Sequence, residues 1–168
     1  GKTNWKHWRF VDFITGGEGT AMAPWQESIK ASTDVPSASG ARTSLNYWAY
    51  GNIRSANEIL QILSEASFDP ATVNEQMAEA KFLRAFMYFE MAKRYGGVPL
   101  ELTPKQLDAT YDELNTPRST LQETYDQILS DCDAAIAGLP ASAMSGKATK
   151  SAARALKSRV ALYAARIA

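Results

Sequence analysis

Residues 82–89 read FLRAFMYF and residues 95–100 read YGGVPL, and these two stretches decide the fold. The first stretch is apolar on nearly every side of a helix, so we expect a central helix that its neighbours cover. The second stretch ends this helix, because glycine permits a left-handed turn and proline blocks continuation. Upstream, Asp69-Pro70 fits an N-cap followed by proline at the first helical position. The sequence therefore predicts a long helix from about residue 69 to residue 95.

Three more helices are predicted around this one from apolar residues at helical spacing. One precedes it, from about Ser44 to Leu63. Another begins at Ser119-Thr120, where either hydroxyl can form a capping box, and Gly138-Leu139-Pro140 closes it. The last runs from about Thr149 to the chain end. The residues expected to face inward in these three helices are Leu45, Ala49, Ile53, Ala56, Leu60 and Leu63; Leu121, Tyr125, Ile128, Cys132, Ala135 and Leu139; and Ala152, Leu156, Val160, Tyr163 and Ile167. The predicted fold is all-α.

The four helices form two hairpins that resemble each other. The Tyr-x-x-Ile pattern of residues 50–53 recurs at residues 125–128, and Leu83 in the first hairpin matches Leu156 in the second. A nearly constant offset indicates a repeated helix–turn–helix unit, as in helical solenoids. Such arrays usually need about three or more units, and the last helix stops at Ala168 without a cap or breaker. We therefore expect that the chain is truncated.

The first 42 residues differ from the rest of the chain. They hold three of the four tryptophans and a glycine cluster at residues 16–19, and residues 31–40 have the composition of a loop. We expect a short aromatic helix near Trp5–Ile14 followed by a long loop. The predicted organisation is therefore an N-terminal segment, 1–42, and a helical domain, 43–168.

Composition argues against several classes of function. Lysine and arginine number 18, as do aspartate and glutamate, so the chain lacks the positive field that nucleic-acid binding normally requires. No apolar run reaches the ~20 residues of a membrane-spanning helix. The single cysteine excludes an internal disulfide, and the single histidine, His7, excludes the usual zinc sites because no second His or Cys lies nearby.

Catalysis has little support in the sequence. A Ser–His–Asp set cannot be placed with a single histidine, and the glycines at residues 16–19 lack the Gly-Lys-Ser/Thr of a phosphate-binding loop. The carboxylates on the helices are spaced like solvated faces. We therefore predict no catalytic residue, no metal site and no cofactor.

Four segments together resemble the SusD/RagB family, the surface nutrient-binding lipoproteins of Bacteroidetes. They are WAYGNIRSAN at residues 48–57; EAKFLRAFMYF at 79–89 with YGGVPL at 95–100; RST at 118–120 with YDQILSD at 125–131 and Leu139-Pro140; and GKATK at 146–150 with the helical residues that follow, to Tyr163. Each segment alone is modest, but four in the right order are specific. Two departures are Cys132, where the family usually has leucine, and the missing lipobox cysteine.

The resemblance implies a fold and a function. The fold would be an α-α superhelix of tetratricopeptide-like hairpins, with a long aromatic-containing N-terminal loop. The protein would capture a glycan, or less often a peptide, at the cell surface and act as a lid over a SusC-like TonB-dependent transporter. It would be held at the outer membrane by a lipid anchor outside this chain. Family members continue past this chain's end, and the missing part usually supplies a share of the ligand site.

Within this chain, Trp25 is the candidate for the ligand site. It lies in the predicted loop, in Pro24-Trp25-Gln26-Glu27, where no helical stripe requires it. A flat aromatic face can stack on a sugar ring while polar groups fix the hydroxyls, and Asp34, Arg42 and Asn46 are the candidate partners. The alternative role for Trp25 is to anchor the loop to the core.

For the other distinctive side chains we favour structural roles. Trp48, placed on the first helix, would pack between helices. Arg84, Arg118 and Arg159 would pair with carboxylates such as Glu79 or cap helix-end carbonyls. Cys132 would be a small buried hydrophobe.

Two other functions stay open. One is a tetratricopeptide-type scaffold that binds a protein segment on its concave face. The other is an all-helical glycan hydrolase, which would need a pair of carboxylates across a cleft.

Overall fold

The computed structural model describes residues 48–105, 110 and 114–165, all within one unit of the chain, Trp48–Ala168. This part of the chain holds four α-helices and no strand: α3 (Tyr50–Glu65), α4 (Pro70–Tyr95), α6 (Leu121–Gly138) and α7 (Lys150–Ala164). The predicted all-α fold is confirmed. The predicted N-terminal helix at 5–14 and the loop after it lie outside the described residues, and the division of the chain at residue 42 stays a prediction.

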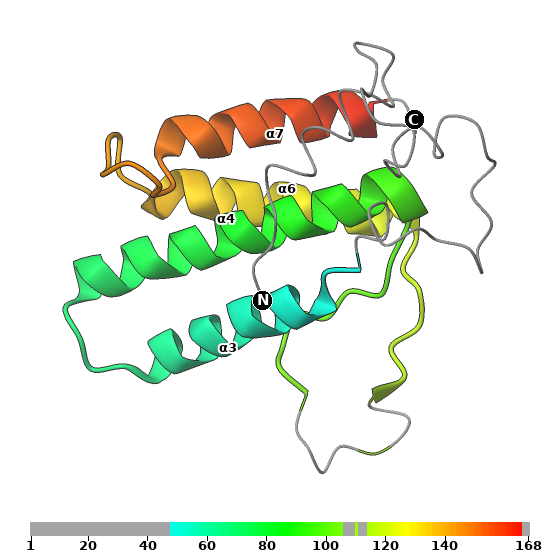
Figure 1. The fold of residues 1–168 in the computed structure, drawn as a ribbon, viewed down its shortest axis with the longest axis horizontal. Helices are drawn as coiled ribbons and strands as arrows, with labels where there is room; N and C mark the ends of the chain where they lie inside the picture. Colours follow the sequence, from blue (N-terminus) through cyan, green and yellow to red (C-terminus); the bar gives the residue numbers. More distant parts are fainter. Residues whose placement is uncertain (1–47, 106–109, 111–113, 166–168) are drawn as a thin grey trace, which may run out of the picture. The chain divides into compact units, whose positions relative to one another are not determined.

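Helix α4 is central, as its apolar sequence predicts. It packs against α3 on one side and α6 on the other, and it also touches α7 (Figure 1). Helix α7 packs mainly on α6. Small side chains allow α4, α6 and α7 to approach closely, because Ala78, Ala135 and Ala153 form a buried cluster with Leu139. The order in space thus follows the order in sequence, as in stacked helical hairpins.

The two ends of α4 follow the predicted signals. The Asp69 carboxylate accepts a hydrogen bond from the Thr72 backbone N–H at 3.0 Å, and Pro70 is the first helical residue. At the other end Gly96 has a φ of 75° and its N–H donates to the Ala92 carbonyl. This left-handed conformation is open to glycine at little cost. Both predicted boundaries are confirmed.

The start of α6 is fixed by a capping box. The Thr120 hydroxyl accepts from the Glu123 N–H at 3.1 Å, and the Glu123 carboxylate accepts from the Thr120 N–H at 2.8 Å. Gly97 lies so close to this turn that a Cβ on it would collide with the Ser119 carbonyl. Beyond it, the N–H of buried Val98 donates to the Thr124 hydroxyl. The segment after α4 is thereby held against the first turn of α6.

The predicted inward-facing stripes are largely confirmed among the described residues, and Leu45 and Ile167 lie outside them. The buried residues of these stripes are Ala49, Ile53, Ala56 and Leu63; Tyr125, Ile128, Cys132, Ala135 and Leu139; and Leu156 and Val160. Tyr163 is an exception, because 43% of its surface is exposed, although its ring makes a T-shaped contact with Phe89. The two residues of the proposed Leu83–Leu156 match differ in burial, since Leu83 is 38% exposed and Leu156 is buried.

The predicted start of the first helix is wrong. Helix α3 begins at Tyr50, and Trp48 and Ala49 precede it in a non-helical conformation. The Ala49 carbonyl accepts from the N–H groups of Asn52 and Ile53, but Ala49 has no side chain that could cap the helix. An alanine at this position gives no sequence signal for a helix start.

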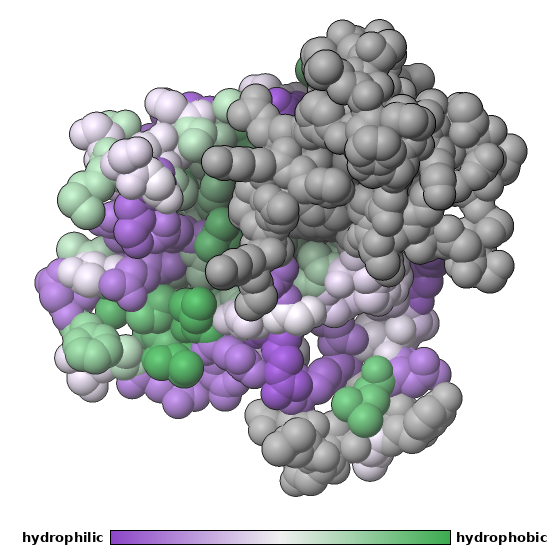
Figure 2. Space-filling model, in the orientation of Figure 1, coloured by the Kyte–Doolittle hydropathy of each residue, from purple (hydrophilic) through white to green (hydrophobic). Residues whose placement is uncertain are grey.

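In the view of Figure 2 the described surface mixes hydrophilic and hydrophobic residues, and a hydrophobic patch lies over the end of α3 and the α3–α4 turn. The exposed hydrophobic residues of this region are Ile59, Ile62 and Phe68. None of the described helices is long and apolar enough to cross a membrane.

Candidate functional site

A buried polar network joins the two hairpins. The Arg84 guanidinium donates to both carboxylate oxygens of Asp131, from Nε and Nη2, each at 2.7 Å. Only 7% of the Arg84 side chain and 4% of the Asp131 side chain are exposed. The pair therefore bridges α4 and α6 in a bidentate geometry away from solvent.

Arg84 also reaches the first helix and the segment after α4. Its Nη1 donates to Asn57 Oδ1 at 2.8 Å and to the Leu102 carbonyl at 3.3 Å. Arg84 pairs with a carboxylate, as predicted, but this carboxylate belongs to Asp131 and not to Glu79. Glu79 instead accepts from Lys147, which precedes α7, at 2.9 Å. The Asp131 partner lies on the other hairpin, where helical spacing along α4 cannot point to it.

Two tyrosines and Asn57 fix the segment that follows α4. The Tyr88 hydroxyl donates to the Glu101 carbonyl at 2.9 Å and accepts from the Glu101 N–H at 2.7 Å. Asn57 Nδ2 donates to the same carbonyl at 2.8 Å, and the Tyr50 hydroxyl donates to the Pro99 carbonyl at 2.6 Å. Burial raises the pKa of both tyrosines well above the usual range, so both stay protonated donors.

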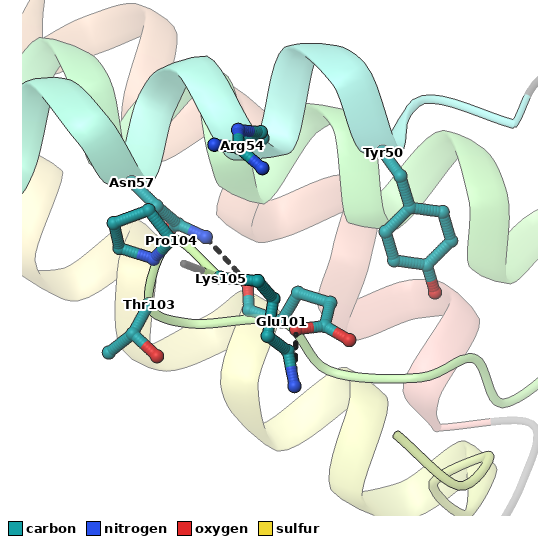
Figure 3. A pocket seen from close by; sticks show the side chains of 7 residues that line it. All are labelled: Tyr50, Arg54, Asn57, Glu101, Thr103, Pro104 and Lys105. Atoms are coloured by element: carbon teal, nitrogen blue, oxygen red, sulfur yellow. Dashed lines mark hydrogen bonds and ion pairs between the residues drawn. The ribbon is translucent and has the colours of Figure 1, made fainter. Parts of the chain in front are cut away.

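Two open pockets that share lining residues adjoin each other between α3 and this segment, and together we call them the α3 groove. Its first part, about 230 Å³, is shown in Figure 3: Tyr50, Arg54 and Asn57 come from α3, and Glu101, Thr103, Pro104 and Lys105 from the segment opposite. Its second part, about 480 Å³, shares Asn57, Thr103 and Pro104 and adds Leu60, Gln61, Ser64 and Leu102. Small-molecule sites usually occupy roughly 300–1,000 Å³, so the groove is large enough for a ligand.

The charged groups of the groove are paired. Arg54 Nε donates to Glu58 one turn further along α3 at 2.7 Å. Lys105 Nζ lies 3.4 Å from the Glu101 carboxylate and donates to the Thr116 hydroxyl at 2.9 Å. Each cation thus has a carboxylate beside it, and the groove carries little net field.

An aromatic cluster lies at the Tyr50 end of the groove. The Trp48 ring makes edge contacts with Tyr50 and Tyr95, each with centroids 5.1 Å apart. Half of Trp48 is exposed. The prediction that Trp48 lies on the first helix is wrong, because Trp48 precedes α3. The predicted packing between helices is confirmed in part, since the ring contacts Tyr50 of α3 and Tyr95 of α4 while its other side faces solvent. Arg118 and Arg159 are likewise exposed.

Cys132 is buried in α6, as predicted. Burial raises the pKa of its thiol to about 12, and the neighbouring carboxylates of Asp131 and Asp133 act in the same direction. The thiol is therefore protonated and poorly nucleophilic at neutral pH. Among the described residues no three His, Cys, Asp or Glu side chains are grouped as a metal site would require.

The four residues predicted for the ligand site, Trp25, Asp34, Arg42 and Asn46, all lie outside the described residues, as does His7. They stay predictions. The α3 groove has no signal in the sequence, although Asn57 belongs to the segment 48–57 that resembles the family. Half of the groove is an irregular segment held through its backbone carbonyls, and such contacts leave no pattern in the sequence.

Comparison with known proteins gives the family. The model of a SusD-like family, described as starch-binding associating with outer membrane, matches residues 7–162. A SusD-like protein, P38, of Formosa agariphila is 33% identical over 114 residues, which cover 68% of this chain and 22% of that protein.

Solved structures agree. A SusD-like protein from Bacteroides fragilis is 39% identical with a TM-score of 0.66, over 71% of this chain and 24% of that one. A laminarin-binding SusD-like protein is 30% identical with a TM-score of 0.65, over 71% of this chain and 26% of that one. This chain thus spans about a quarter of the length of these relatives. Because the family model covers most of its residues, the chain belongs to the SusD-like family.

Proposed function

We propose that this chain is part of a non-enzymatic cell-surface protein that captures an oligosaccharide for uptake. The observation that carries the proposal is the match of a starch-binding, outer-membrane-associated family to residues 7–162. The relative that binds laminarin, at 30% identity, supports a glycan as the ligand. A peptide is the alternative ligand that the family resemblance leaves.

The proposed partner is a SusC-like TonB-dependent transporter, over which the protein would act as a lid. The helical hairpins would be the rigid scaffold, since Arg84 ties α3, α4 and α6 together through buried hydrogen bonds. The exposed patch of Ile59, Ile62 and Phe68 offers apolar surface for such a contact. A lipid anchor outside this chain would hold the protein at the outer membrane.

The proposed ligand site within this chain is Trp25, with Asp34, Arg42 and Asn46 as polar partners. A tryptophan face covers the apolar face of a sugar, and the polar side chains fix its hydroxyl groups. An open stacking site buries little of its ligand, so we expect a Kd of roughly micromolar to millimolar, or about −8 to −4 kcal/mol.

Calorimetric titration of the full-length protein tests the ligand. We expect saturable binding of laminarin oligosaccharides or another neutral glycan, and a weaker Kd for a folded Trp25→Ala variant. Absence of binding to every glycan in a broad panel would contradict the proposed function. Unchanged affinity in Trp25→Ala would remove only Trp25 from the site.

Purification of the tagged protein from outer membranes tests the partner. A TonB-dependent transporter should co-purify in stoichiometric amount. The double substitution Ile62→Ser and Phe68→Ser should weaken this association if the α3–α4 patch takes part in it. A tetratricopeptide-type scaffold for another protein, the alternative function, has no support from the relatives named above, which are all SusD-like.

A further inference from the structure

The α3 groove is elongated. Its lining residues run along α3 from Tyr50 to Ser64, which are 14 positions apart, so it follows the helix for roughly 21 Å at ~1.5 Å per residue. Residues of the segment Glu101–Lys105 line the other side of both parts. Because the groove is open and long, it suits a chain-like ligand that lies along the helix.

The floor of the groove is preorganised. Asn57 is 2% exposed, and its Oδ1 accepts from Arg84 while its Nδ2 donates to the Glu101 carbonyl. The segment opposite is held by Tyr88 and Tyr50. A ligand would therefore meet a shape that needs no ordering on binding, which favours affinity.

The walls alternate polar and apolar groups. Leu60, Leu102 and Pro104 supply apolar surface, and Gln61 and Thr103 are exposed polar side chains beside them. Within the part of the chain that the structure describes, neither the Gln61 amide nor the Thr103 hydroxyl has a hydrogen-bond partner. Sugars present C–H faces and hydroxyl groups in alternation, so such walls match their chemistry.

The charge pairs in the groove discriminate between classes of glycan. Arg54 lies against Glu58 and Lys105 against Glu101. An acidic sugar that approached either cation would also meet the paired carboxylate, so attraction and repulsion offset each other. A neutral sugar meets no such opposition.

Trp48 extends this surface beyond Tyr50. Its ring is half exposed and is held by edge contacts with Tyr50 and Tyr95. A tryptophan fixed in this way has little freedom to lose when it stacks on a ligand.

We propose that the α3 groove, with Trp48 at its Tyr50 end, is a subsite for a neutral oligosaccharide. The inference rests on the proposed function, since it assumes that the protein captures glycans. In this subsite Gln61 and Thr103 form hydrogen bonds with the sugar hydroxyls, and the sugar stacks on the Trp48 ring.

Titration of the full-length protein with a panel of neutral and uronate-containing oligosaccharides tests the subsite. The double substitution Gln61→Ala and Thr103→Ala should weaken neutral-glycan binding about tenfold, because two hydrogen bonds to the ligand are lost. Thr103→Trp should weaken it as strongly by filling the groove. Gln76→Ala is the matched control, since Gln76 is exposed on α4 and does not line the groove, and its affinity should not change.

The outcomes separate the subsite from the function. Wild-type affinity in both groove variants, together with glycan binding that Trp25→Ala weakens, would overturn the subsite and leave the proposed function standing. Groove-dependent binding of uronate oligosaccharides alone would overturn the assignment to neutral sugars. Absence of binding to the whole panel by the wild type would overturn both. Circular dichroism of each variant shows whether it is folded.

Discussion

The guanidinium of Arg84 and the carboxylate of Asp131 form a bidentate ion pair that joins the two helical hairpins, with both N–O distances 2.7 Å. Arg84 also donates to Asn57 and to the Leu102 carbonyl. One side chain therefore sets the position of α3, α6 and the segment after α4 at once. The geometry of the α3 groove depends on it, although Arg84 does not line the groove.

Asp131→Ala should strongly destabilise the protein. It leaves the Arg84 charge buried without its carboxylate, which typically costs about 3–5 kcal/mol. Asp133→Ala is the control: Asp133 pairs with Lys157 on the surface, and such pairs contribute roughly 0–1 kcal/mol. Urea unfolding followed by circular dichroism measures both. Equal losses for the two variants would contradict the role of the buried pair.

The double variant Arg84→Met and Asp131→Leu should recover much of that loss. Apolar residues of similar volume often replace a buried ion pair without cost, because both desolvation penalties are removed. The same urea titration measures it. A double variant as unstable as Asp131→Ala alone would show that the other hydrogen bonds of Arg84 matter more than the charge pair.

Tyr88→Phe should loosen the segment opposite α3. The Tyr88 hydroxyl is both donor and acceptor for Glu101, and its removal leaves the partly buried Glu101 N–H without this partner at a cost of about 1–3 kcal/mol, while Asn57 still donates to the Glu101 carbonyl. Tyr163→Phe is the control, since Tyr163 is 43% exposed. Hydrogen exchange should show faster exchange at Glu101 in Tyr88→Phe only. Unchanged protection of that amide would contradict the prediction.

Acid should weaken the cap of α6. Hydrogen bonds from the Thr120 backbone and then its side chain lower the pKa of Glu123 in the folded state. The stabilisation is therefore complete above the unfolded pKa of about 4.3 and is lost as pH falls through the lower, folded value. Glu123→Gln should reduce the pH dependence of the urea midpoint in that window. An unchanged slope would rule out this contribution.

Cys132 should resist alkylation in the folded protein. Its thiol is buried, and its pKa of about 12 leaves almost no thiolate at pH 8. Iodoacetamide labelling followed by mass spectrometry should give modification in urea and almost none without it. Rapid labelling of the native protein would contradict the burial of this side chain.

Elements with local signals could be predicted from the sequence. Asp69-Pro70 and Gly96 indicate the two ends of α4, and Thr120 with Glu123 indicates the start of α6. These signals can be recognised in the sequence because a helix cap involves residues within one turn. The start of α3 could not be predicted in this way, since Ala49 offers no capping group.

The groove and its floor could not be predicted from the sequence, because both depend on contacts between residues that are far apart in the chain. Arg84 and Asp131 are 47 positions apart, and Asn57 reaches Glu101 across 44 positions. Their meeting depends on how whole helices pack, and the bonds to Pro99, Glu101 and Leu102 use backbone carbonyls that every residue carries. The predicted site residues around Trp25 stay predictions.

The central claim is that the protein captures a glycan without changing it. Equilibrium dialysis of the full-length protein against a neutral oligosaccharide, followed by chromatography of the sugar, tests both halves of this claim. We expect saturable uptake into the protein chamber and recovery of the oligosaccharide at its original length. Failure to retain any oligosaccharide of the panel, or the appearance of shorter products with purified protein, would contradict it.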